Sequence, residues 1–459
     1  MSKKWSRRDF LKTSALLSAG AVLAACAPAA QPQPPQGATT APQATPPPAG
    51  KKKIVFSAYT WSNFEAKMTE VLNGWVAVTP NVEYEPQFVP QTIDYWAKIQ
   101  TQVAGGTPPD VSISDYGHLV SYAKSGTLLD ITNYVMTSKF PLDTMFAGAT
   151  AQYRWANGDF AAGAPGGNYY GLPSDAQSYI FAYNKKMFDD AGVAYPTDDW
   201  TWDDMVIAAQ KITKADENKW GILYIDPGIL FSRAIWVRAA GGENHSADFT
   251  KSLLADPKTL EAYKWSWDLI YTHKVAPAPG NVGQQNPFMS GQVAMVVDGV
   301  WWVTDFGAGI KDFDWDVALF PKHPQTGKRT TSLESDGWWV YKGAKEPDTA
   351  WSLVSYLAGA KGQQIMSDAG FCIPPNIQEV SKLWYAQKPP EHRLKILDNI
   401  NQDSAAVDIT YFEAGTISNA VMPIIGKAFS DGTDITAAMK EADKVMNEEL
   451  AKAWALLKS

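Results

Sequence analysis

Short β-rich runs alternate with helical runs at the start of the folded part of the chain. Residues 53–59 are β-rich and end at a Trp-Ser-Asn turn, and 64–78 then place apolar residues at helical spacing. Residues 82–89 predict a second strand, and 93–104 predict a second helix that ends at a Gly-Gly pair. Strands that alternate with helices predict an α/β fold with a mostly parallel sheet, whose ligands bind beyond the carboxyl ends of the strands.

The first 26 residues carry the pattern of an exported protein. Arg7 and Arg8 lie in a twin-arginine export signature, and a weakly apolar run follows from 13 to 25. This run is too short to span a bilayer as a stable helix. It ends in Leu-Ala-Ala-Cys26, which resembles the bacterial lipobox, where the cysteine is acylated after cleavage in front of it. We therefore predict a signal peptide at 1–25 and a lipid anchor on Cys26; the alternative is an ordinary signal peptide with a chance cysteine.

The segment that follows the cysteine differs in composition from the rest of the chain. Residues 26–50 are almost entirely Pro, Ala, Gln and Thr, which offer little to bury and favour an extended, solvated chain. We predict a disordered tether here. The body from residue 51 to 459 is long enough for two lobes of ordinary domain size.

Charge and cysteine content narrow the possible functions. The formal net charge is −8, and it falls to −12 without the signal peptide, which argues against nucleic acid as a partner. Because Cys26 is committed to lipid, Cys372 has no intramolecular partner, and we expect a structural thiol without a disulfide or metal role. The five histidines lack the spacing of a zinc site, so we expect no metal and no cofactor.

Aromatic residues are abundant and often lie in turn-like contexts. The chain has 19 Trp, 19 Tyr and 18 Phe, and tryptophans beside Gly or polar residues include Trp61, Trp301 and Trp338. Flat indole faces match the C–H faces of pyranose rings, while carboxylates and amides bind the hydroxyls. This composition favours a sugar site, although ordinary core packing explains any single tryptophan.

Several short segments occur in the order found in one known family. They are Gly-Thr-Pro-Pro-Asp-Val at 106–111 with 123–130, Tyr-Gly-Leu-Pro at 170–173 with Tyr-Asn-Lys at 183–185, Phe-Met-Ser-Gly-Gln-Val-Ala-Met at 288–295, and the helical run 350–354. Together they resemble the extracellular solute-binding proteins of ABC transporters, in the sugar-binding group (family 1) that includes maltose-binding proteins. A Gly-rich insertion at 161–168 and the doubled tryptophans at 301–302 and 338–339 depart from the family pattern.

The resemblance implies the two-lobed periplasmic-binding-protein fold (type II), with α/β lobes joined by hinge crossovers and the ligand in the cleft between them. From the motif positions, lobe one would comprise 51–150 and 318–366, and lobe two 151–317 and 367–459. The implied role is that of a monomeric, non-enzymatic lipoprotein of an ABC importer. It would capture a carbohydrate, such as an oligosaccharide or glycoside, by lobe closure and deliver it to permease subunits. The expected location is the outer face of the cytoplasmic membrane or the periplasm.

Two other functions remain open at this point. The same fold could bind a non-sugar solute such as a peptide or a polyamine. A secreted glycoside hydrolase would also be rich in Trp, Asp and Glu, and it needs two carboxyl groups across roughly 5 to 10 Å. No hydrolase motif occurs in the sequence, and product release from an oligosaccharide would distinguish this class.

The predicted cleft residues combine aromatic rings with carboxylates that follow strands or turns. We expect the rings to stack on sugar faces and the carboxylates to accept hydroxyl hydrogen bonds, whereas a helix cap or a surface pair is the alternative for each acid. Trp236 is included because it precedes a Gly-Gly pair in a stretch that the family uses as a cleft wall. The full set is Trp61, Asp115, Tyr116, Asp175, Trp236, Asp298, Trp301, Asp336 and Trp338.

The predicted anchor gives a direct test. Cys26→Ser removes the acylated thiol and should move the protein from the membrane fraction to the soluble fraction without reducing sugar affinity. Cys372→Ser is the matched control and should leave the location unchanged. If the Cys26→Ser protein stayed with the membrane after signal cleavage, a protein partner would have to supply the attachment.

Overall fold

The computed structural model describes residues 50–60, 64–90, 95–163, 166–280, 286–368, 370, 373–374, 380–401, 405–407 and 411–459. Cys26, Trp61 and Cys372 lie outside these ranges, as do the predicted signal peptide and almost all of the predicted tether. Within the described part of the chain, no helix combines the length and the apolar character that a bilayer crossing requires.

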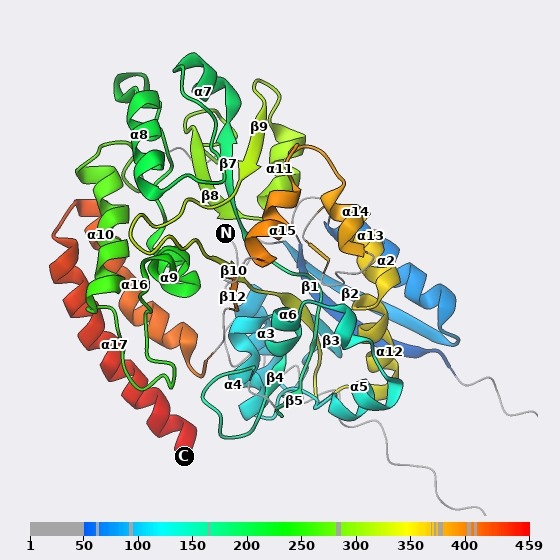
Figure 1. Ribbon diagram of the computed structural model, residues 1–459. Helices are drawn as coiled ribbons and strands as arrows, with labels where there is room; N and C mark the ends of the chain where they lie inside the picture. Colours follow the sequence, from blue (N-terminus) through cyan, green and yellow to red (C-terminus); the bar gives the residue numbers. More distant parts are fainter. Residues whose placement is uncertain are drawn as a thin grey trace, which may run out of the picture. The chain divides into compact units, whose positions relative to one another are not determined.

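The first sheet has the strand order β2-β1-β3-β11-β6 (Figure 1). Parallel pairs join β1 (Lys52–Thr60) to β2 (Val82–Pro90) and to β3 (Val111–Asp115). The late strand β11 (Asp336–Val340) lies antiparallel between β3 and β6 (Leu172–Pro173). Segments far apart in the sequence therefore share one sheet. The sequence predicts a mostly parallel sheet, and the observed sheet is mixed, with two parallel and two antiparallel strand pairs.

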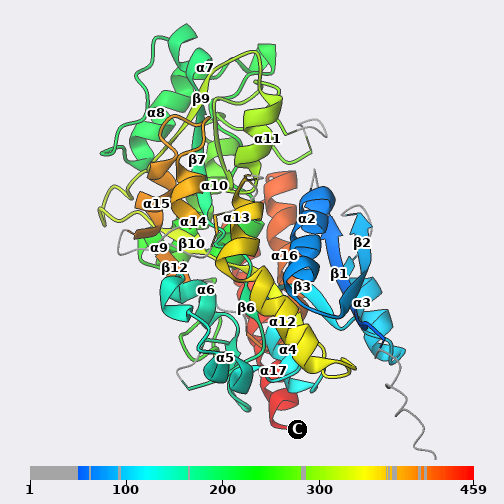
Figure 2. The ribbon, with the colours of Figure 1, turned by 90° about the vertical axis from the view of Figure 1, so that its right-hand side faces the viewer.

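The alternation of side chains along β1 explains how helices cover both faces of this sheet. Phe56 is fully buried on the face that packs against α2 (Phe64–Val78), whose buried residues recur at helical spacing. Helix α12 (Pro347–Leu357) lies on the same side, and Ser352 Oγ accepts a hydrogen bond of 3.1 Å from the indole of Trp75 (Figure 2). On the other face, the hydroxyl of Tyr95 in α3 (Tyr95–Ala104) donates to the carbonyl of Ser57 at 3.3 Å.

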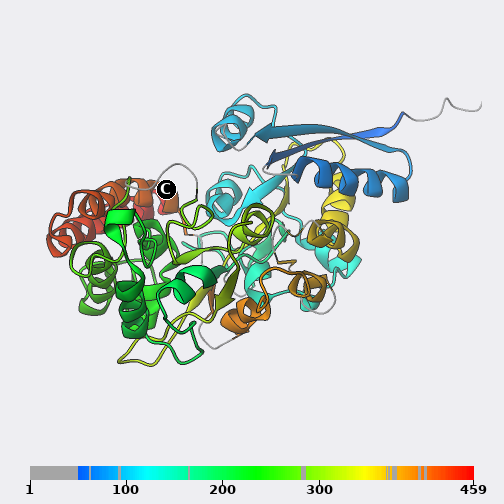
Figure 3. The ribbon, with the colours of Figure 1, turned by 90° about the horizontal axis from the view of Figure 1, so that it is seen from above.

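The second sheet is a three-stranded antiparallel sheet with the order β8-β7-β9. Strand β7 (Tyr179–Asn184) is buried throughout and pairs with β8 (Met295–Gly299) and β9 (Trp315–Ala318). Helices surround this sheet. Figure 3 shows the green and red segments of this part of the protein apart from the blue strands of the first sheet. Its larger helices are α8 (Trp202–Ile212), α10 (Pro257–Tyr271), α11 (Trp302–Gly309), α16 (Ala414–Asp431) and α17 (Ile435–Lys458).

Shorter elements complete the fold. They are α4 (Leu119–Lys124), α5 (Thr132–Ser138), α6 (Ala147–Ala151), α7 (Lys185–Asp190), α9 (Ile235–Ala240), α13 (Ala360–Asp368), α14 (Val380–Tyr385), α15 (Leu394–Asn401), β4 (Arg154–Trp155), β5 (Asn168–Tyr169), β10 (Thr331–Leu333) and β12 (Ala405–Val407). Helices α16 and α17 pack against each other, and α17 also packs against α10.

Three crossing segments connect the two sheets and lie side by side. The first joins β6 to β7 at 174–178, the second joins β9 to β11 through β10, and the third, of which Ile373 and Pro374 are described, follows α13. Ala176 N donates to Ile373 O at 2.7 Å, and the backbones of Gln177 and Glu334 exchange two hydrogen bonds of 2.6 and 2.9 Å. Ser178 and Thr331 add a hydroxyl pair at 3.0 Å. We call these three segments the hinge.

The first crossing segment of the hinge lies later in the chain than the motif positions predict. Strand β6 belongs to the first sheet although it lies beyond residue 150, in the block that the sequence analysis assigned to lobe two. Tyr153 supports this assignment, because its ring packs against the backbone of Gly337 in β11. Gly337 also lies close to β6, since a Cβ added at Gly337 would come within 2.5 Å of Leu172 O. The residue bounds of the lobes stay a prediction.

Candidate functional site

Three of the predicted cleft residues lie together at the hinge. The carboxylate of Asp175 accepts hydrogen bonds from the backbone N–H of Asp336 at 2.8 Å and from the amide of Gln177 at 3.0 Å. The carboxylate of Asp336 in turn accepts one from the hydroxyl of Tyr59. Trp338 is 2% exposed and packs on Phe56 with ring centroids 5.7 Å apart. Asp175 and Asp336 therefore hold the crossing segments in register, whereas Trp338 is buried in the core of the first sheet.

Asp115 and Tyr116 adjoin the same end of the first sheet. Asp115 is the last residue of β3 and lies opposite Asp336 in the antiparallel register, and Tyr116 begins a 3₁₀ turn that ends at His118. Their backbones are thus brought to the hinge, whereas their side chains lie outside the described part of the structure. Trp61, which follows β1, also lies outside it.

Asp298 and Trp301 form a second group at the end of β8. The ring of Trp301 meets Tyr179 edge-to-face with centroids 5.7 Å apart. Burial raises the pKa of Asp298 to about 7, although the N–H of Gly299 and the amide of Asn286 hydrogen-bond the carboxylate and oppose the shift. An acid in this environment changes charge near neutral pH, which is unusual for a carboxyl group on a protein surface.

The fold places Trp236 neither at the hinge nor beside Asp298 and Trp301. Its side chain is 1% exposed and packs in the core against Trp202 and Trp265, with ring centroids 5.3 and 4.8 Å apart. The Gly-Gly pair that suggested a cleft wall ends helix α9 instead. Gly241 adopts φ +89° as the C-cap, and a Cβ on Gly242 would come within 2.7 Å of Thr259 N at the start of α10. The expectation that Trp236 lines the cleft is therefore corrected by the structure.

The structure also adds residues that the sequence did not indicate. Arg233 donates to Glu334 at 3.2 Å, and its guanidinium lies over the ring of Tyr179 at 5.7 Å. Glu334 belongs to the hinge, and its side chain is 3% exposed, so this ion pair ties the second sheet's helices to the crossing segments. Arg233 ends a five-residue π-helix, Ile229–Arg233, and such turns are rare and concentrate at functional sites. No motif marks any of these positions.

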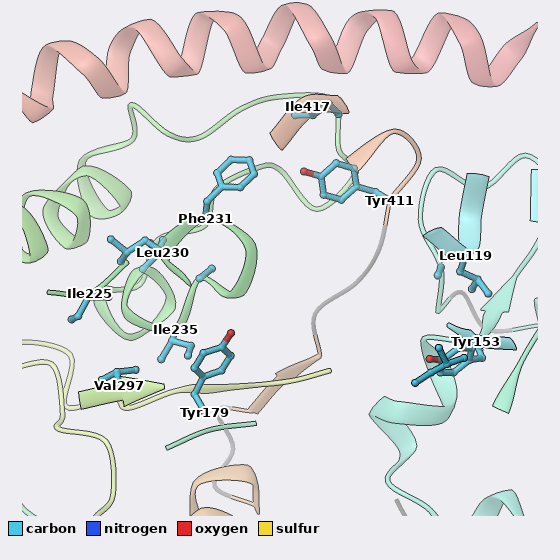
Figure 4. Close-up of a cluster of buried hydrophobic side chains, with 14 of the residues drawn as sticks. Leu119, Tyr153, Tyr179, Ile225, Leu230, Phe231, Ile235, Val297, Tyr411 and Ile417 are labelled. Atoms are coloured by element: carbon cyan, nitrogen blue, oxygen red, sulfur yellow. The ribbon is translucent and has the colours of Figure 1, made fainter. Parts of the chain in front are cut away.

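A cavity of about 440 Å³ lies between elements of the two sheets. Gly117, beside the end of β3, lines one side of it, and the other side comes from the π-helix Ile229–Arg233, α9, the segment 243–249 and the start of α16. Figure 4 shows the side chains of Phe231 and Tyr411, which both line the cavity, pointing toward each other. The volume falls in the range of pockets that hold small-molecule ligands, and aromatic walls with few polar groups are typical of them.

The polar groups at this cavity suit neutral, hydroxyl-rich ligands. His245 lines it, and burial lowers the pKa of its imidazole, which favours the uncharged ring. Arg238 and Glu243, also at the cavity, neutralise each other through hydrogen bonds of 3.1 and 3.2 Å. Among the described residues no group of three or more His, Cys, Asp or Glu could hold a metal ion.

Comparison with known proteins identifies the family. A family model of bacterial extracellular solute-binding proteins matches residues 77–393. A binding protein of Brucella abortus is 25% identical over 419 residues, which cover 88% of this chain and 92% of that protein. The maltotriose-binding protein of Pyrococcus abyssi is 24% identical over 317 residues, covering 67% of this chain and 63% of that protein.

Solved structures agree with this assignment. The ABC substrate-binding protein of Listeria monocytogenes in complex with cycloalternan aligns with a TM-score of 0.77 and 25% identity. The alignment covers 87% of this chain and 99% of that protein, which confirms the predicted two-lobed α/β fold. Because the family model spans more than half of the chain, the protein belongs to the bacterial extracellular solute-binding proteins.

Proposed function

We propose that this protein captures a carbohydrate between its lobes and delivers it to the membrane permease of an ABC importer. The observation that carries the proposal is the 440 Å³ cavity between elements of the two sheets, which has aromatic walls and a neutral polar lining. The relative named for maltotriose and the structural neighbour solved with cycloalternan support a saccharide as ligand. Cys26 would hold the protein at the membrane through lipid.

Binding in this proposal needs no chemical change in the ligand. The hinge pairs its segments through antiparallel bridges at Gln177 and Glu334 and at Ala176 and Ile373, and the two sheets would rotate about this narrow connection. A ligand that touches both lobes stabilises the closed form more than the open form, and the population shifts accordingly. The permease can then distinguish the loaded, closed protein from the empty, open one.

Within the second group, Trp301 and Asp298 take different roles. The partly exposed indole of Trp301 would stack on a sugar ring, and the position of its ring is fixed by Tyr179 and by the absence of a Cβ on Gly299. The ionised carboxylate of Asp298 would accept hydrogen bonds from sugar hydroxyls. Asp175 and Asp336 already accept hydrogen bonds within the hinge, so we propose that they act by shaping the cleft.

A saccharide panel tests the function. The purified body, residues 50–459, is incubated with maltotriose, cycloalternan, mannotriose and monosaccharides, and both the melting temperature and the products are measured. Because binding to the folded state alone adds RT ln(1 + [L]/Kd) to stability, at least one saccharide should raise the melting temperature as its concentration rises. The sugar should be recovered intact. Catalytic release of shorter sugars would instead establish a hydrolase, and stabilisation by peptides or polyamines alone would contradict the carbohydrate assignment.

The raised pKa of Asp298 predicts a pH dependence of binding. If the ionised carboxylate accepts ligand hydroxyl groups, affinity should weaken by up to about tenfold per pH unit below 7 and level off above it. Asp298→Asn should remove this dependence. Trp301→Ala is the control, since it removes no titratable group and should weaken binding by about 1–3 kcal/mol at every pH. Calorimetric titration between pH 5.5 and 8.5 measures both, and a wild-type affinity independent of pH would exclude Asp298 as an acceptor.

A further inference from the structure

We propose that Arg233 is a positioning residue for ligand binding, which fixes the ring of Tyr179 against the hinge and, through that ring, the indole of Trp301. The inference rests on the proposed function, in which this indole stacks on a sugar. It goes beyond that function because it assigns a role in binding to a residue that needs no contact with the ligand. Three successive contacts connect the hinge to the indole, and each is described in turn below.

The first contact is a buried ion pair at the hinge. Arg233 Nη2 lies 3.2 Å from each carboxylate oxygen of Glu334, whose side chain is 3% exposed. A buried carboxylate needs a charged partner or hydrogen-bond donors close by, and the guanidinium supplies both. The backbone of Glu334 is itself paired with that of Gln177 in the hinge. The guanidinium is therefore attached to a fixed point on the crossing segments.

The second contact places the same guanidinium over an aromatic ring. Its central carbon lies 5.7 Å from the ring centroid of Tyr179, which is within the range of a cation–π contact. Tyr179 is 3% exposed and begins β7 directly after the first crossing segment. A planar guanidinium can donate to a carboxylate within its plane while its face lies against a ring, which a lysine ammonium cannot do. Arginine is thus suited to hold both partners at once.

The third contact joins this tyrosine to the indole. The rings of Tyr179 and Trp301 meet edge-to-face, with centroids 5.7 Å apart and an angle of 79° between their planes. Gly299 lies opposite Tyr179 in the pairing of β7 with β8, and a Cβ at Gly299 would come within 2.1 Å of the indole. Trp301 therefore packs between a ring and bare backbone. A binding group whose position is set before the ligand arrives loses less entropy on binding.

The backbone that presents Arg233 is itself held in an unusual conformation. In the π-helix Ile229–Arg233, the N–H of Ala234 donates to the carbonyl of Ile229 at 3.1 Å, and Ala234 follows with φ +50°. A left-handed residue with a Cβ costs energy, so outside contacts must support the turn. The buried amide of Asn244 donates to two carbonyls of the turn at 2.9 and 2.7 Å. These contacts fix the point from which the arginine side chain extends to the hinge.

Fluorine NMR of the ligand-free protein tests the positioning. The compact unit of residues 50–459 is labelled with 5-fluorotryptophan, and the spectrum of Trp301→Phe assigns the Trp301 resonance. Arg233→Met removes the charge but keeps an unbranched stem, so it should shift or broaden this resonance. Arg154→Met is the matched control, because Arg154 lies over the ring of Tyr169 at 5.0 Å and belongs to β4; it should leave the resonance unchanged. A Trp301 resonance that Arg233→Met leaves as in the wild type would overturn the proposal.

Calorimetric titration tests the consequence for binding. The probe is maltotriose, or another saccharide of the panel if that one binds more tightly. Arg233→Met should weaken binding about three- to tenfold in the wild-type background and by less than about twofold in the Trp301→Ala background, because the guanidinium acts through that indole. Equal losses in both backgrounds would indicate a general structural role and contradict the proposal.

Two further outcomes are separable. A wild type that binds no saccharide of the panel contradicts the proposed function and with it the role in binding, whereas the ligand-free spectrum still decides whether Arg233 positions Trp301. If Arg233→Met does not fold, Glu334→Gln replaces it. Glutamine keeps the size of the hinge side chain and a carbonyl acceptor but removes the charge that holds the guanidinium, so it carries the same expectations in both measurements.

Discussion

The structure depends on hydrogen bonds that hold three crossing segments side by side between two sheets. The backbones of Gln177 and Glu334 pair, and the buried carboxylate of Asp175 accepts the N–H of Asp336. A buried polar backbone must be paired, so these bonds set the register in which the chain passes from one sheet to the other. Rotation about such a narrow connection changes few contacts, whereas rotation elsewhere would break sheet pairing. Both the position of the cleft and its ability to close follow from this hinge.

The chemistry of the cleft is divided between two places. Asp298 and Trp301 lie at the end of β8, where a partly buried carboxylate titrates near neutral pH. The cavity around Phe231 and Tyr411 is uncharged apart from one compensated ion pair. Neutral, amphipathic surfaces of this kind discriminate sugars through shape and hydroxyl geometry rather than through charge. A net charge of −8 over the whole sequence is compatible with such a ligand.

Local elements could be predicted from the sequence, whereas long-range placement could not. The helix expected at 64–78 is observed as α2 (Phe64–Val78), because amphipathic periodicity is a local signal. The cleft position expected for Trp236 is wrong, since a glycine pair after a tryptophan indicates a helix end as readily as an open loop. The sequence does not indicate His245 and Tyr411 as neighbours, because they meet at one cavity only after folding and no motif links them. The sequence does not indicate the contact between Arg233 and Glu334 for the same reason.

We propose that the ligand closes the two lobes about the hinge without being altered. Small-angle X-ray scattering of the body, residues 50–459, with and without the saccharide that stabilises it most, measures this most directly. Closure of the lobes should give the saturated protein a smaller radius of gyration, with the intact sugar recovered afterwards. An unchanged radius of gyration at saturation would contradict closure, and recovery of cleaved sugar would contradict a binding role.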